Sequence, residues 1–373
     1  MNRRSLSLLL LVLVLAAPRA HAAIVETRTG RLQGALGWEK DHLTIDGKKI
    51  DWAKVLYLLC DSTDKPAGAA SIVRLKSGEA WTAEILRVAD KQLHVRSPKL
   101  GEMKLDLAQV AELDFLPSEV RPTDLKAGTL YRSKGEPVPG TLLALDGERL
   151  TMDSPLGEVK LPRKGLTRFV FALPLTARVE KAIDEVALVD GSVFRGTLRP
   201  TEGGAELEHP LLGKLKLTPS VVRSVVRRSP DATSLVTLTP RAAETASLLG
   251  ATSGPARYAI LDADLRSGLR CLDGLRIEPK TTMRYILPKS EGKKRTLRLT
   301  LASAEGARGD AKLRVLLGDR TVLERDVKPA DASRVVVAEL PAGDELTIEV
   351  DFGARLRFPC AVVLADAYLL TEG

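Results

Sequence analysis

The line Ser97-Pro98-Lys99-Leu100-Gly101-Glu102-Met103-Lys104-Leu105 is repeated twice, with small changes, along this 373-residue chain. It returns as Ser154-Pro155-Leu156-Gly157-Glu158-Val159-Lys160-Leu161 and as His209-Pro210-Leu211-Leu212-Gly213-Lys214-Leu215-Lys216-Leu217. The glycines Gly101, Gly157 and Gly213 are separated by 56 residues in both intervals. A fixed interval indicates a duplicated supersecondary unit. We therefore expect this unit to organise the first two-thirds of the chain.

The residues around each line predict short antiparallel strands. Turn signals such as Ser77-Gly78 and Asp190-Gly191 separate two alternating segments ahead of the line. Glycine adopts the positive φ of such hairpin turns without steric cost. An apolar segment then closes each copy, and its aligned positions are Leu58, Leu113, Phe169 and Val225.

Five short strands in about 45 residues are too few for a sandwich and predict a small, strongly bent β-barrel. The pattern resembles the Sm-like and SH3-like barrels, and this resemblance implies a fold without implying an activity. Because so small a unit buries little core alone, we expect neighbouring barrels to pair edge strands or to pack face to face. The predicted units are a short repeat at 23–60 and barrels at 71–116, 128–172 and 185–228.

The N-terminus has the pattern of an export signal. A pair of arginines precedes an apolar run from Leu6 to Leu15, which is too short to span a bilayer. Small residues at the −3 and −1 positions predict cleavage between Ala22 and Ala23, which makes residues 1–22 a signal peptide. No later apolar run reaches membrane-span length. We therefore expect a secreted or periplasmic protein with no membrane span after cleavage.

From residue 234 onward the repeated line is absent and longer alternating strands replace it. Leu297, Leu299 and Leu301, for example, alternate with other residues in the period of a half-buried strand. About eight strands in about 140 residues, without a helical pattern, predict a β-sandwich of jelly-roll type over 234–373. The predicted fold class is thus all-β, with tandem small β-barrel repeats followed by a jelly-roll β-sandwich.

Short motifs follow one another through this last module. They are Leu238-Thr239-Pro240, Gly268-Leu269 with Gly274, Pro279-Lys280-Thr281 leading into Tyr285-Ile286-Leu287, Leu316-Leu317-Gly318-Asp319, and Asp366-Ala367-Tyr368-Leu369. Together they resemble the NPCBM family of carbohydrate-binding modules, found beside exported glycosidases and on bacterial surface proteins. The resemblance covers Ser234 to the end and implies a jelly roll that recognises glycan. It departs from the family at Glu278, where a histidine is common.

Residues that carry chemistry are sparse. The chain beyond the signal has three histidines, His42, His94 and His209, in different repeats, and such positions favour satisfied strand residues over metal ligands or catalytic bases. No nucleophile elbow, phosphate loop or zinc-protease motif occurs. We therefore predict no catalytic residue, no metal, no cofactor and no enzymatic activity. A hydrolase built on carboxylates is the least favoured alternative.

One aromatic residue and two cysteines are the candidate site residues. Tyr258 is the best candidate for an exposed ring that packs on a pyranose, although a structural role is favoured for it. Cys271 and Cys360 lie near the two ends of the last module, and two interpretations remain open. They form a disulfide in an oxidising compartment, or they are two separate buried thiols. Cys60 aligns with Phe115 and is predicted to be a small buried hydrophobe.

The formal net charge of +8 does not require a nucleic-acid partner. Basic residues are scattered among acidic ones along the predicted strands, which favours a solvated surface of mixed charge over a polyanion site. The leading hypothesis is a non-catalytic binding protein whose last module recognises a cell-wall or extracellular polysaccharide. The alternative is a scaffolding protein that docks on an envelope protein and binds no sugar. The oligomeric state is left open.

Overall fold

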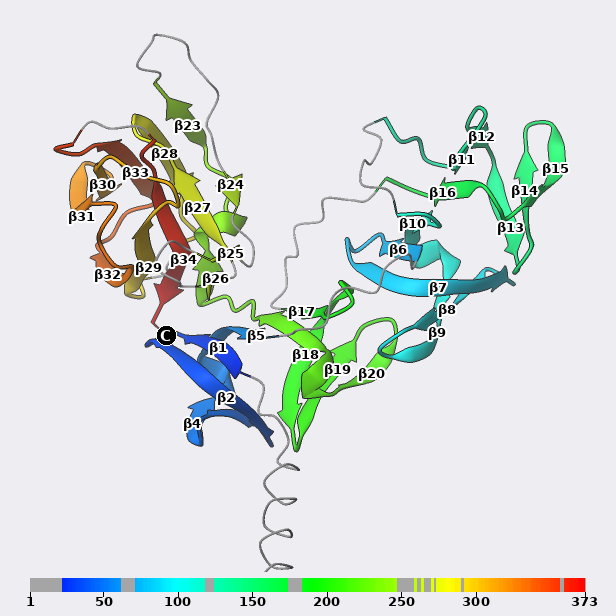
Figure 1. Ribbon diagram of the computed structural model, residues 1–373, viewed down its shortest axis with the longest axis horizontal. Coiled ribbons are helices and arrows are strands. Elements are labelled where there is room, and N and C mark those ends of the chain that lie inside the picture. The colour runs from blue at the N-terminus through cyan, green and yellow to red at the C-terminus, as the bar shows by residue number, and fades with distance from the viewer. Residues whose placement is uncertain are drawn as a thin grey trace, which may run out of the picture. The chain divides into compact units, whose positions relative to one another are not determined.

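The computed structural model describes residues 22–372, except 62–70, 118–123, 174–182, 247–257, 260–262, 265–269, 272, 290–291 and 356–358. Its regular structure is β-strand apart from four single turns of 3-10 helix at Trp52–Lys54, Leu107–Gln109, Pro219–Val221 and Leu235–Thr237, so the all-β prediction is confirmed (Figure 1). The chain divides into two compact units, Met1–Arg227 (unit 1) and Arg228–Gly373 (unit 2).

Unit 1 contains four strand sets, which we call repeats 1 to 4 in chain order. Repeat 1 has β1 (Ala22–Thr27), β2 (Arg31–Glu39), β3 (His42–Ile45), β4 (Lys48–Asp51) and β5 (Val55–Cys60). Repeat 2 has β6 (Ser71–Leu75), β7 (Ala80–Ala89), β8 (Gln92–Ser97), β9 (Gly101–Asp106) and β10 (Val110–Asp114). Repeat 3 has β11 (Thr129–Arg132), β12 (Val138–Pro139), β13 (Thr141–Leu145), β14 (Arg149–Ser154), β15 (Gly157–Pro162) and β16 (Leu166–Val170). Repeat 4 has β17 (Asp184–Leu188), β18 (Val193–Thr201), β19 (Gly204–His209), β20 (Gly213–Leu217) and β21 (Val222–Val226).

The repeated sequence line forms a tight hairpin in repeats 2, 3 and 4. In repeat 2 it joins β8 to β9, with Ser97 opposite Gly101. The glycines at the 56-residue interval, Gly101, Gly157 and Gly213, have φ of +79°, +100° and +69°. An L-residue avoids this left-handed region because its Cβ meets the backbone. The interval in the sequence is thus the interval between turns that need glycine.

The repeats do not close into separate barrels, so that part of the prediction was wrong. The last strand of each repeat pairs instead with the last strand of another: β10 with β16, and β5 with β21. A unit of about 45 residues has too little apolar surface to enclose a core of its own. Sharing an edge strand lets two repeats build one core, and the expected edge-strand pairing is confirmed.

Both pairings join equivalent positions of two repeats. Leu113 lies opposite Phe169, and Leu58 lies opposite Val225. These four residues occupy the same position when the repeats are aligned with one another. Because equivalent positions face each other across antiparallel strands, each pair of repeats is related by a local twofold axis, as in an isologous dimer interface. Repeat 2 is therefore paired with repeat 3, and repeat 1 with the distant repeat 4.

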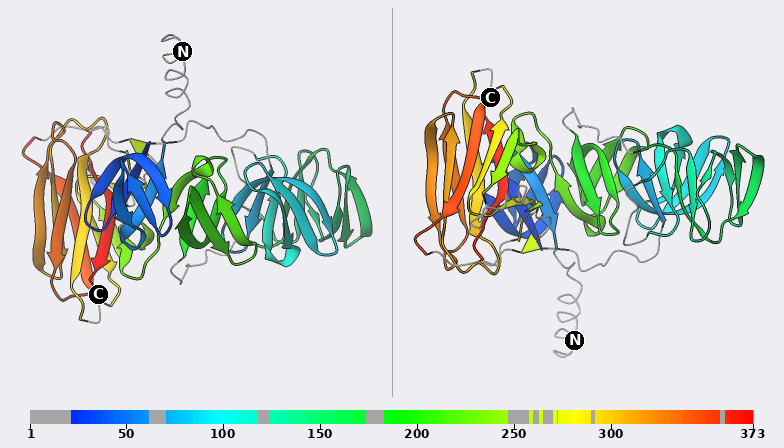
Figure 2. Two further views of the ribbon diagram at one scale, coloured as in Figure 1. Left: turned by 90° about the horizontal axis from the view of Figure 1, so that it is seen from below. Right: turned by 90° about the horizontal axis from the view of Figure 1, so that it is seen from above.

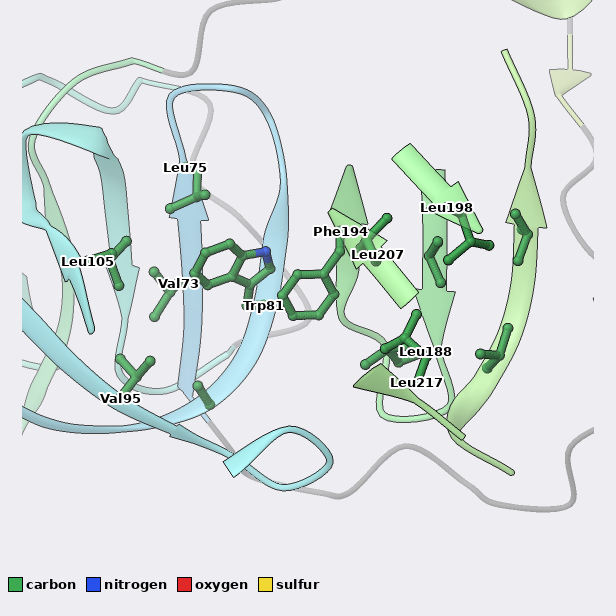
Figure 3. Packing of buried hydrophobic residues seen from close by; sticks show 14 of the residues in the cluster. Val73, Leu75, Trp81, Val95, Leu105, Leu188, Phe194, Leu198, Leu207 and Leu217 are labelled. Carbon is green, nitrogen blue, oxygen red and sulfur yellow. The ribbon is translucent and has the colours of Figure 1, made fainter. Parts of the chain in front are cut away.

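A different contact joins repeat 2 to repeat 4. Ala80 of β7 lies opposite Val193 of β18. The rings of Trp81 and Phe194 stack with centroids 5.1 Å apart and planes 18° from parallel, which Figure 3 shows at the centre of the cluster. One hydrophobic core runs through all four repeats. Within unit 1 the repeats are therefore neighbours in the order 1, 4, 2, 3, as the blue, green, cyan and teal strands of Figure 2 show.

Unit 2 is a sandwich of two antiparallel sheets. The first has the order β24 (Tyr258–Ala259), β27 (Gly274–Ile277), β34 (Val362–Thr371), β29 (Arg295–Ser303) and β32 (Arg334–Leu340), with β22 (Ala232–Ser234) also paired to β34. The second has the order β23 (Ala242–Thr245), β28 (Thr281–Ile286), β33 (Glu345–Phe352), β30 (Ala311–Leu317) and β31 (Arg320–Val327). A two-stranded ribbon joins β25 (Ala263–Asp264) to β26 (Arg270–Cys271). The core between the sheets includes the predicted Leu297, Leu299 and Leu301.

Candidate functional site

The outer face of the second sheet of unit 2 carries a polar groove. The alternation of β28, β33 and β30 buries residues such as Met283 and Val315 and directs their neighbours outward. A hollow of about 300 Å³ lies on this face. Its lining residues are Ala246, Lys280, Thr281, Thr282, Lys312, Arg314, Glu349, Val350 and Asp351.

The strand register arranges the groove in two rows that cross the sheet. In one row Thr282 of β28 lies opposite Glu349 of β33, which lies opposite Arg314 of β30. In the next row Asp351 of β33 lies opposite Lys312 of β30. Since side chains of opposed residues lie on the same face, each row brings oppositely charged groups together.

Ion pairs hold the groove side chains in place. Lys280 Nζ lies 2.9 Å from Asp351 Oδ1, and Arg314 Nη1 lies 3.6 Å from Glu349 Oε2. A hydrogen bond from Lys280 lowers the pKa of Asp351, so this carboxylate stays ionised in mildly acidic solution. The four side chains are 35% to 43% exposed, and their free lone pairs and N–H groups therefore face solvent. Such a surface can bind a polyhydroxylated ligand through charge-assisted hydrogen bonds.

The backbone of Lys280 adds a local strain at the groove. This residue has φ of +61°, in the left-handed region that residues with a Cβ seldom adopt. Strain of this kind costs free energy and is concentrated at functional sites. Pro279-Lys280-Thr281 is one of the motifs that resemble the NPCBM family, but the sequence alone does not place Lys280 in a groove.

Tyr258, the predicted ligand-binding residue, lies in β24 and its backbone pairs with Arg276 of β27. Its side chain lies outside the described part of the structure. It belongs to the first sheet, whereas the groove is on the second. The proposed stacking role of Tyr258 therefore stays a prediction.

Cys271 and Cys360, for which a disulfide and two separate thiols were both left open, are buried in the described part of the structure, and no disulfide is assigned between them there. Cys271 is fully buried in a small cluster with Ala302, Ala304, Ala361, Val363 and Ala365. The disulfide and the two separate buried thiols therefore both stay predictions. Cys60 is a buried residue, as predicted; burial, with a smaller contribution from Asp61, raises the pKa of its thiol to about 12. A thiol with so high a pKa does not act as a nucleophile at neutral pH.

His209 is a buried structural residue at the contact between repeats 2 and 4. Its Nδ1 accepts hydrogen bonds from the backbone amides of Leu211 and Leu212, at 3.1 and 3.2 Å. The ring proton is therefore on Nε2, which donates to Glu79 Oε1 of repeat 2 over 2.9 Å. The side chain of Ser97 accepts the equivalent pair of amide bonds in repeat 2. His209 thus keeps the turn function of that serine and also joins two repeats.

Asp273 is a buried carboxylic acid that the sequence did not single out. It lies just before β27, is 9% exposed, and accepts a hydrogen bond from Ser234 Oγ over 3.1 Å. Burial raises its pKa to about 6, against the smaller opposing effect of that hydrogen bond.

No group of three or more metal-ligating side chains occurs among the described residues. No helix among them is long and apolar enough to cross a membrane.

Comparison with known proteins gives structural neighbours only. No family model matches the chain, and no curated protein matches it. A CBM51 module from a Clostridium perfringens GH95 protein, solved in complex with methyl-galactose, is 14% identical over 37% of this chain and 99% of its own, with a TM-score of 0.29. Tandem CBM51 modules of a family 98 glycoside hydrolase from Streptococcus pneumoniae are 12% identical over 51% and 72%, with a TM-score of 0.31. An exo-β-1,3-galactanase from Phanerochaete chrysosporium is 11% identical over 85% and 78%, with a TM-score of 0.23.

Proposed function

We propose that unit 2 binds a glycan in the groove on the outer face of its second sheet. The observation that carries the proposal is the groove itself: two rows of fixed carboxylates, amines and a threonine around a hollow of about 300 Å³. This volume is at the lower end of the range for small-ligand sites, which suits a short saccharide segment. The motifs that resemble the NPCBM family point to the same class of ligand.

The chemistry of binding would be recognition of adjacent hydroxyl groups. A carboxylate such as Asp351 accepts a hydrogen bond from one hydroxyl, while Lys280 donates to the oxygen of the next. Hydrogen bonds with an ionised partner are roughly twice as strong as neutral ones. The ion pairs already hold the side chains, so little rotamer freedom is lost when the sugar binds.

Affinity electrophoresis in gels that contain single polysaccharides tests this proposal with the full chain. The variant carrying Arg314→Gln and Glu349→Gln removes one positive and one negative charge from the groove. A control carrying Arg325→Gln and Glu339→Gln makes the same change at exposed positions outside the groove lining. We expect a polysaccharide that retards the wild type and the control but not the groove variant. Equal retardation of all three proteins would refute the groove as the site.

We further propose that the protein is exported and has no catalytic role. The N-terminal pattern supports export, although residues 1–21 lie outside the described part of the chain. The absence of a recognisable catalytic motif in the sequence supports a binding role without a cofactor. N-terminal sequencing of the secreted protein is expected to begin at Ala23.

A scaffolding role for unit 1 is the second candidate. The observation that favours it is the twofold pairing of repeats through β5 with β21 and β10 with β16. Such pairing builds a continuous rigid support from small units. Scaffolding by unit 1 would either accompany glycan binding by unit 2 or be the only function of the protein. Recovery of one envelope protein at fixed stoichiometry by cross-linking, together with no retention on any polysaccharide, would favour scaffolding alone.

A further inference from the structure

A second cavity in unit 2 lies beside the start of β29 and the end of β34. Its volume is about 210 Å³, equivalent to about seven water molecules in the liquid. The buried side chains of Leu287 and Leu369 contribute apolar lining.

The cavity is positively charged. It is lined by Lys289, Lys293 and Arg295, with Asp231 as the acidic residue among its described lining residues. Within the described residues, which exclude 290–291, the structure pairs none of these three cations with a carboxylate. Asp231 is itself engaged in an interaction, so it is not a free carboxylate.

Arg295 is the key group because its charge is buried. The residue is 7% exposed. Its guanidinium donates to the carbonyl oxygens of Pro288, over 3.1 Å, and of Gly343. These bonds orient the side chain but do not neutralise it. A buried charge without an opposite charge is costly, and an anion brought into the cavity would offset that cost.

We propose that this cavity binds an anionic sugar residue, through the carboxylate of a uronic acid or a sulfate ester. The proposal rests on the glycan-binding function of unit 2 and adds a second, charge-selective subsite to it. The two lysines would contact the anionic group directly, since both are exposed at the cavity rim. Arg295 would supply the fixed positive potential beneath it. The apolar lining from Leu287 and Leu369 would contact the C–H face of the ring.

Calorimetric titration of the full chain with glucuronate, glucose 6-sulfate, glucose and inorganic sulfate tests the inference. One variant carries Lys289→Met and Lys293→Met. Its control carries Lys164→Met and Lys328→Met, which removes the same charge at exposed positions outside the cavity. We expect at least one anionic sugar to bind at least about tenfold more tightly than glucose, and the cavity variant to lose about tenfold or more of that affinity. The control is expected to change it less than twofold.

Three outcomes would overturn the inference. They are equal affinity for glucose and both anionic sugars, equal losses in the cavity variant and its control, and binding of inorganic sulfate as tight as that of the sugars. The glucuronate and sulfate arms identify which anion is preferred. If a neutral polysaccharide is still retained by the groove, the proposed function stands while this subsite fails. If the anionic sugars bind and no polysaccharide depends on the groove, the cavity is the site and the groove proposal fails.

Discussion

Replacing His209 by the serine of the equivalent repeat positions separates its two structural functions. His209→Ser keeps an acceptor for the two amides of the turn, as Ser97 does in repeat 2. It removes the bond to Glu79 and the edge contact of the ring with Trp81, whose centroid is 5.6 Å away. Glu79 then keeps the bonds from Ser77 Oγ and from the Arg195 amide of repeat 4 but loses the imidazole, the second of these two partners from repeat 4.

The expected cost follows from these contacts. A hydrogen bond to a buried carboxylate contributes about 2 kcal/mol. The space left by the imidazole beside Trp81 and Phe194 adds about 1–2 kcal/mol, because a fixed core relaxes only in part. We therefore expect His209→Ser to lower the free energy of unfolding of unit 1 by about 3–4 kcal/mol.

Urea denaturation followed by tryptophan fluorescence measures this change directly. All three tryptophans of the chain, Trp38, Trp52 and Trp81, belong to unit 1, so the signal reports that unit alone. The control is His94→Ser, at a partly exposed strand position, with an expected change below about 0.5 kcal/mol. Equal losses in the two variants would refute the linking role of His209.

Three further results are expected. Because the pKa of Asp273 is raised from 3.8 to about 6, its contribution to stability is greatest below about pH 4 and is lost, by about 3 kcal/mol, as the pH rises from 4 to 6 and above. Asp273→Asn should remove this contribution from the pH profile measured by chemical denaturation. Gly157→Ala, at φ of +100°, should lower the unfolding free energy by about 1 kcal/mol, while Gly30→Ala, where the added Cβ meets no neighbour, should be nearly neutral in the same assay. Thiol titration should detect no fast-reacting cysteine in the native protein and three in urea without reductant; two missing thiols in urea would indicate a bond between Cys271 and Cys360.

The sequence predicted the strands better than it predicted their partners. Turn glycines and period-two alternation are local signals, and they located the hairpins of repeats 2 to 4 and the longer strands of unit 2. The pairing partner of the β10 edge depends on the apolar surface that stays exposed after each small repeat folds. That surface depends on two repeats at once, so alternation within one repeat cannot reveal the pairing of Leu113 with Phe169.

The sites were less predictable, for a similar reason. Alternation shows that Thr282, Arg314 and Glu349 are on the outer faces of strands, but only the register of three strands places them in one row. A signal for His209 was present, because it stands where two other repeats have serine. The spacing of Cys271 and Cys360 in the chain does not determine whether they are bonded, because their approach depends on packing in the folded sandwich.

The central claim is that the groove of unit 2 binds glycan. Backbone amide resonances of the full, isotopically labelled chain, recorded while a retained oligosaccharide is added, test it most directly. The account predicts saturable shifts that are largest in β28, β33 and β30, around Thr282, Arg314 and Glu349. Shifts confined to other strands, or none at a concentration that saturates retention, would contradict it.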